Sequence, residues 1–132
     1  MDEEGNIYMV GQYRYVTGKY SIEIPEGGGP LDIDPLDSAK RELKEETGLE
    51  ANSWEKLFEM DLSNSVTDER AIVYLATDLQ QGESNPEETE ELTVSKIHIT
   101  EAYQMVLDGK ITDSITVAAL FKMKIKSLEN EK

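Results

Sequence analysis

Two stretches near the start of the chain have apolar or aromatic residues at alternate positions, which is the period of a half-buried β-strand: Ile7, Met9, Tyr13 and Tyr15, and then Tyr20, Ile22 and Ile24. This alternation predicts one strand over residues 7–15 and a second over residues 20–24. A turn at residues 17–19, with glycine at its centre, joins the two strands.

A helix is expected after a run of three glycines at residues 27–29, where the backbone can adopt positive φ and approach a ligand closely. Asp34 and Pro35 fit the N-cap and the first helical position. The apolar stripe of this helix is formed by Leu36, Ala39 and Leu43. Gly48 predicts its end.

The remaining pattern predicts three more strands and two more helices. The strands are expected over residues 54–60, 71–76 and 92–99, with an acidic loop over residues 78–91. The helices are expected from Thr100 to Gly109 and from Asp113 to about Lys126, with Thr100 and Asp113 as N-caps. No internal repeat is present. The pattern therefore predicts a single α/β (α+β) domain over residues 1–132.

Composition narrows the classes of function. The chain has 28 acidic and 13 basic residues, a net charge of −15, which disfavours binding to a nucleic-acid backbone. It has no cysteine and no apolar run long enough for a membrane span or signal peptide. The expected protein is cytoplasmic, without nucleic-acid or membrane partners.

The most informative feature is a group of three glutamates near the end of the first helix. Glu42 lies three and four residues before Glu45 and Glu46, so their like charges are neighbours on the helix. The negative end of the helix dipole raises the cost of placing them there. Either the helix has a solvated acidic face, or the carboxylates bind a hard divalent cation such as Mg²⁺. The glycine loop before the helix favours the interpretation that these carboxylates bind a cation.

These residues resemble the signature of the Nudix hydrolase family. That signature is a glycine, five residues, a glutamate, seven residues, and then Arg-Glu-hydrophobic-x-Glu-Glu-x-Gly-hydrophobic. Gly27 matches its first position, and residues 41–49 match its second half. Ile33 replaces the first signature glutamate, and Asp32 and Asp34 are candidate substitutes for it.

The resemblance implies the Nudix fold, a mixed β-sheet sandwiched between helices. Within the family, the sequence most resembles the subgroup of ADP-ribose and nucleoside-diphosphate-sugar pyrophosphatases. The stretches that carry this likeness are residues 12–15, 23–28, 67–70, 109–111 and 116–120. The implied substrate is a small nucleotide diphosphate, and the implied cofactor is Mg²⁺, with Mn²⁺ as the alternative. A homodimer is also implied, although the N-terminal strands usual in the subgroup are absent from this sequence.

The resemblance also assigns the site residues. The implied metal ligands are the main-chain carbonyl of Glu26 and the side chains of Glu42, Glu45, Glu46 and Glu90. Glu45, Glu46 and Glu90 would also be catalytic. Glu90 belongs to a late loop in which Glu88 and Glu91 are close alternatives. Arg41 is expected to point away from the carboxylates and to orient the structure.

The implied substrate-binding residues are Arg14, Glu23, Gly27, Gly28 and Arg70. Arg14 would contact a substrate phosphate, or else be a surface strand arginine. Glu23 would contact the sugar or nucleotide, or else pair across strands.

A second function stays open. Ile33 and the missing front strands also suit a weakened Nudix domain that binds a nucleotide ligand or a protein partner without turnover. Retention of Glu42, Glu45 and Glu46 favours the enzyme, because a binding module gains nothing from a costly anion cluster.

Overall fold

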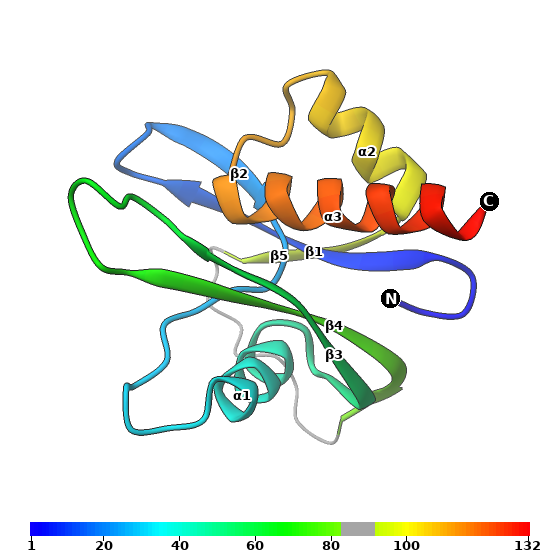
Figure 1. The fold of residues 1–132 in the computed structure, drawn as a ribbon, viewed down its shortest axis with the longest axis horizontal. Helices are drawn as coiled ribbons and strands as arrows, with labels where there is room; N and C mark the ends of the chain where they lie inside the picture. The colour runs from blue at the N-terminus through cyan, green and yellow to red at the C-terminus, as the bar shows by residue number, and fades with distance from the viewer. Residues whose placement is uncertain (83–91) are drawn as a thin grey trace.

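The protein has the expected α+β class (Figure 1). The computed structural model describes residues 1–82 and 92–132. In chain order the strands are β1 (Asn6–Arg14), β2 (Lys19–Glu23), β3 (Leu49–Asp61), β4 (Arg70–Gln81) and β5 (Thr93–His98). The helices are α1 (Pro35–Thr47), α2 (Ile99–Leu107) and α3 (Ser114–Asn130). No helix in the described ranges is long and apolar enough to cross a membrane.

The described strands pair as two antiparallel sheets, where we expected one mixed sheet. One sheet has the order β2-β1-β5, and the other consists of β3 and β4. A cavity of about 820 Å³ has Ile7 and Tyr8 of β1 and residues 70–76 of β4 in its lining. The N-terminal ammonium donates to the Ala76 carbonyl at 2.5 Å. Within the described residues, β4 therefore faces β1 across this cavity and forms no ladder with it.

Helices cover the sheets from two sides (Figure 1). α2 and α3 pack on the β2-β1-β5 sheet, and α1 packs on β3 and β4. The buried centre on the α2–α3 side consists of Met9, Ala102, Ile111 and Leu120. Burying a side chain the size of methionine or leucine contributes about 1.5–3 kcal/mol. Met9 belongs to β1, so this core fixes α3 against β1, and Ile22 of β2, the strand that leads to the glycine loop, packs against the same core.

α1 has the caps that the sequence predicts. Asp34 is the N-cap, its side chain accepts a hydrogen bond from the Leu36 N–H at 2.8 Å, and Pro35 begins the helix. Gly48 has φ +75°, and its N–H donates to the Lys44 carbonyl at 2.9 Å. Such a φ favours glycine, which has no Cβ to clash. The two caps fix the ends of the helix and thereby the directions of its glutamates.

Other boundaries differ from prediction. Residues 78–81, expected in a loop, continue β4 because Leu79 to Gln81 pair with residues 49–51 of β3. The N-cap of α2 is His98 rather than Thr100, since the His98 side chain accepts from the Thr100 N–H. α3 is capped by Asp113, as predicted, but runs to Asn130.

Candidate active site

The glycine loop after β2 lies against the glutamate face of α1. The Glu26 main-chain N–H donates to Oε2 of Glu46 at 3.2 Å. The carboxyl group of Glu42 packs so closely on Gly27 that a Cβ there would overlap it. Two of the three signature glutamates therefore touch the loop.

Glu45 lies further round the helix. Its side chain is 49% exposed, whereas that of Glu42 is 18% exposed. Among the described contacts, its charged partner is Arg41, at 3.9 Å. The structure thus brings Glu42 and Glu46 to the loop and leaves Glu45 at the rim of the site. Its role as a metal ligand stays a prediction.

Arg41 does not point away from the carboxylates, contrary to our expectation. Its Nη2 lies 3.2 Å from Oε1 of Glu42 and donates to the Gly28 carbonyl at 3.3 Å. An arginine has five N–H donors in a planar fork, so it can hold two groups at once. Arg41 therefore links the helix to the loop, which fits the orienting role predicted for it.

The electrostatics of Glu46 fit a cation site. Burial, together with repulsion from Glu42, raises the pKa of the Glu46 carboxyl to about 7. Among the described ion pairs none involves Glu46, so its negative charge is poorly compensated, whereas Glu42 has Arg41 beside it. Carboxylate and carbonyl oxygens are the donors that Mg²⁺ prefers. The donor set at the loop and the uncompensated charge both suit a hard divalent ion.

A second polar group surrounds the end of β2. Arg14 binds Glu23 through two hydrogen bonds, of 2.9 Å from Nε and 2.6 Å from Nη2. Glu23 is only 2% exposed. Its burial opposes the charged form, but the hydrogen bonds from Arg14 and Ser21 outweigh that effect and hold the pKa of Glu23 below its usual value. Glu23 therefore pairs with Arg14 across the β1–β2 hairpin. Pairing across strands was the predicted alternative to a contact with the sugar or nucleotide.

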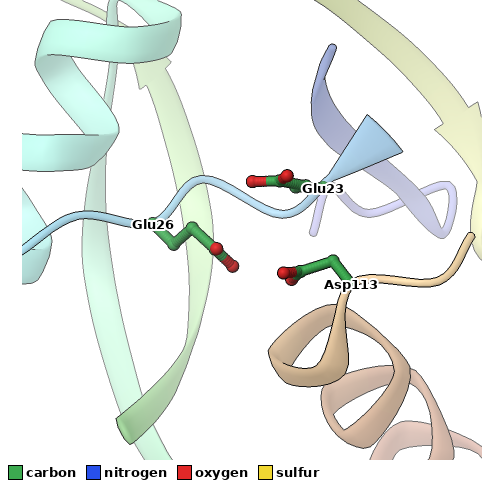
Figure 2. A group of neighbouring side chains, drawn as sticks. All are labelled: Glu23, Glu26 and Asp113. Carbon is green, nitrogen blue, oxygen red and sulfur yellow. The ribbon is translucent and has the colours of Figure 1, made fainter. Parts of the chain in front are cut away.

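Sequence reasoning missed the side chain of Glu26. It points toward Asp113, the N-cap of α3, with Glu23 beside them (Figure 2). Within the described part of the chain, these three carboxylates form a group whose oxygens lie within 4.8 Å of one another. Burial and, next, the neighbouring Asp113 carboxylate raise the pKa of Glu26 to about 9, which favours its protonated form at neutral pH.

Asp113 also binds Thr116, which sequence reasoning named only as part of a family-like stretch. Asp113 Oδ2 accepts from the Thr116 N–H at 3.1 Å and from its hydroxyl at 2.7 Å. An aspartate followed three residues later by threonine at a helix start was visible in the sequence, but nothing there showed that it faces the glycine loop.

The other predicted residues lie at the edges of the site. Arg70 is 62% exposed, lies 3.6 Å from Glu59, and lines the same cavity as Gly27 and Glu42. It also lines a hollow of about 760 Å³ at the turn between β3 and β4. Glu90 and its alternatives Glu88 and Glu91 lie outside the described residues.

We expect Gly27→Ala to displace Glu42 and Gly28→Ala to leave Glu42 in place. A methyl group at Gly27 would push the Glu42 carboxyl away, whereas at Gly28 it would meet nothing within 4 Å. Misplacing a reacting group by an ångström can cost about 10²-fold in rate, so we expect Gly27→Ala to lower turnover at least about tenfold. Steady-state rates of both variants, with melting curves to verify folding, measure the difference. Equal rates would contradict the placement of Glu42.

Comparisons with known proteins show the family of the chain. The chain matches the model described as NUDIX domain over residues 1–115. It is 40% identical over 126 residues to an ADP-ribose pyrophosphatase of Mycobacterium tuberculosis, covering 91% of this chain and 59% of that protein. It is 36% identical over 125 residues to a methanol dehydrogenase activator of Bacillus methanolicus, covering 93% and 68%.

A solved structure supports the fold. The crystal structure of an ADP compounds hydrolase superposes with a TM-score of 0.84 at 22% identity, covering 97% of this chain and 69% of that one. The chain thus spans 59% of the length of the Mycobacterium tuberculosis relative and about two thirds of the other two.

Proposed function

Because the chain belongs to the Nudix family, we propose that it is a Mg²⁺-dependent hydrolase of nucleoside diphosphate sugars, with Mn²⁺ as the alternative ion. The proposed substrate is ADP-ribose or a related compound, cleaved at its diphosphate linkage. The products are a nucleoside monophosphate and a sugar phosphate. The similarity to the Mycobacterium tuberculosis ADP-ribose pyrophosphatase supports this choice of substrate.

The observation that carries the proposal is the contact of Glu42 and Glu46 with the glycine loop. Both carboxylates lie against main-chain atoms of residues 26–27, and the pKa of Glu46 is raised to about 7 by burial and by Glu42. Bound here, a divalent ion would neutralise phosphate charge and activate a water for in-line attack. Glu42 and Glu46 would hold that ion with the Glu26 carbonyl, and Glu45 and Glu90 are the further predicted ligands.

The protein's own groups supply orientation. Arg41 holds the loop and Glu42 in one arrangement through its contacts with both. The Arg14 side chain is 44% exposed, so its guanidinium can meet a substrate phosphate while still bound to Glu23. Gly27 and Gly28 let the substrate approach the main chain closely. Arg70, on the wall of the same cavity, is the proposed contact for the rest of the substrate.

A substrate panel tests the proposal. The protein is incubated with ADP-ribose, other nucleoside diphosphate sugars and dinucleotides, with Mg²⁺ or with chelator, and the products are separated by anion-exchange chromatography. We expect a nucleoside monophosphate that forms only with the metal and is absent with Glu46→Gln. Formation that is insensitive to chelator, or no product from any compound, would refute the proposal. The homodimer and the cytoplasmic location stay predictions, and sedimentation would test the first.

The second candidate is a domain that binds a nucleotide or a protein partner without turnover. Ile33 in place of the signature glutamate motivates it, and so does the relative described as an activator of a methanol dehydrogenase. In the substrate panel, this candidate predicts saturable nucleotide binding without product.

Replacing Ile33 separates the two candidates. Ile33 is 42% exposed, and changes at such positions usually alter stability by less than about 0.5 kcal/mol. We therefore expect Ile33→Glu to fold normally, to keep substrate choice and to maintain or raise the rate. Denaturant unfolding and steady-state kinetics measure both effects. A large loss of stability would mean that the loop has been rebuilt around Ile33, which would favour the binding module.

A further inference from the structure

The first turn of α3 holds the start of the glycine loop. The main-chain N–H of Ile24, the residue after β2, donates to Oγ1 of Thr116 at 3.1 Å, across 92 residues of sequence. Thr116 is fully buried, with 0% exposed. A buried N–H without a partner costs about 1–3 kcal/mol, so this bond specifies where the chain leaves β2.

Asp113 sets the direction of the Thr116 hydroxyl. The hydroxyl proton goes to Asp113 Oδ2 at 2.7 Å, so the lone pairs of Oγ1 face Ile24. The Thr116 N–H binds the same carboxylate oxygen, which caps α3. A β-branched side chain has few χ1 rotamers in a helix, and these bonds select one of them. The hydroxyl is therefore held rigidly as an acceptor.

The link from Thr116 to the carboxylates of α1 is short. Pro25 follows Ile24, and its ring fixes φ. Glu26 comes next, and its N–H donates to Oε2 of Glu46 at 3.2 Å. The loop therefore donates two hydrogen bonds, one from Ile24 to α3 and one from Glu26 to α1, and these hold both ends of the segment 24–26.

We infer that Thr116 is a positioning residue for the metal site, which it serves by fixing the main chain at Ile24 and hence the loop at Glu26. The inference rests on the proposed function, because it concerns the same ion. Groups that orient ligands typically change metal affinity by about 10–100-fold when they are removed. We expect Thr116→Val, which has the same shape without the hydroxyl, to weaken Mn²⁺ binding at least about tenfold. Thr116→Ser keeps the acceptor and should bind Mn²⁺ nearly as the wild type does.

The experiment measures Mn²⁺ affinity without substrate, by titration calorimetry or electron paramagnetic resonance of the free ion. The proteins are wild type, the two Thr116 variants, Glu46→Gln and Val117→Ala. Val117 is the next residue of α3 and packs on the core, so Val117→Ala loses stability but keeps the hydroxyl that accepts from Ile24. Unfolding curves are recorded for each protein, and Thr116→Ala replaces Thr116→Val if the latter does not fold.

The outcomes are distinct. Weak binding by Thr116→Val beside normal binding by Thr116→Ser and Val117→Ala supports the positioning role. Normal binding by Thr116→Val, or equal weakening by Val117→Ala, overturns that role and leaves the proposed function intact. If the wild type binds no Mn²⁺, or if Glu46→Gln binds Mn²⁺ as tightly as the wild type does, the proposed function and this inference are both overturned.

Discussion

Glu46→Gln should lower metal-dependent turnover by about 10²–10⁴-fold, the range for losing a positioned proton acceptor or equivalent metal support. The glutamine keeps the size of the side chain, but its amide supplies a single oxygen. One oxygen must then serve both the Glu26 N–H, bound at 3.2 Å in the wild type, and the ion. Initial rates at saturating substrate, with melting curves of both proteins, measure the loss.

Glu129→Gln is the matched control for this change. Glu129 is an exposed glutamate in the last turn of α3, so its replacement makes the same chemical change at a helix end outside the proposed site. We expect its rate to stay within about twofold of the wild type, as surface substitutions away from special features usually have small effects. A Glu46→Gln enzyme that works at a near-normal rate with Mg²⁺ would show that the catalytic assignment is wrong.

Short-range spacing explains why much of the site could be predicted. The spacing of Glu42 and Glu46 places both on one helix face, and the caps at Asp34 and Gly48 were readable as residue types. The glycine loop precedes the helix directly, so their contact needed no long-range information. The family resemblance added the chemistry to a geometry that the local pattern already favoured.

Long-range contacts explain what could not be predicted. The approach of Thr116 to Ile24 depends on how α3 packs on the sheet, which no local pattern specifies. The predicted orientation of Arg41 was wrong because helix periodicity gives the direction of the first side-chain bonds only. A long arginine side chain can turn back to Gly28. The extension of β4 past the apolar run has the same cause, since pairing with β3 continues through polar residues.

Divalent metal should invert the pH dependence of stability. For Glu46 the pKa is about 7 in the folded protein, above its ordinary value of 4.5, because of burial and Glu42. Between these values the folded state binds more protons than the unfolded state, so the stability contributed by Glu46 falls as pH rises. Glu26, with a pKa of about 9, acts in the same direction over a wider range. Metal-free protein should therefore melt at a lower temperature near pH 8 than near pH 5.

With excess Mg²⁺ we expect the opposite trend. The ion binds the ionised carboxylates, so its stabilisation grows as pH rises through about 7 and reaches about 2.7 kcal/mol when its concentration is about 100 times Kd. Glu46→Gln should remove most of that gain. Without metal, it should be more stable than the wild type near pH 8, by a few tenths to about 1 kcal/mol, because repulsion within the cluster is relieved.

Thermal melts with chelator, with Mg²⁺ and with NaCl of equal ionic strength separate specific binding from screening. A solvated acidic face responds to NaCl as it does to Mg²⁺, and it responds alike in the wild type, Glu46→Gln and the control Glu129→Gln. A metal site gives a large Mg²⁺ shift in the wild type and Glu129→Gln, and a small one in Glu46→Gln. We expect the second pattern, because Glu42 and Glu46 are held against the loop by main-chain contacts that a solvated face does not require.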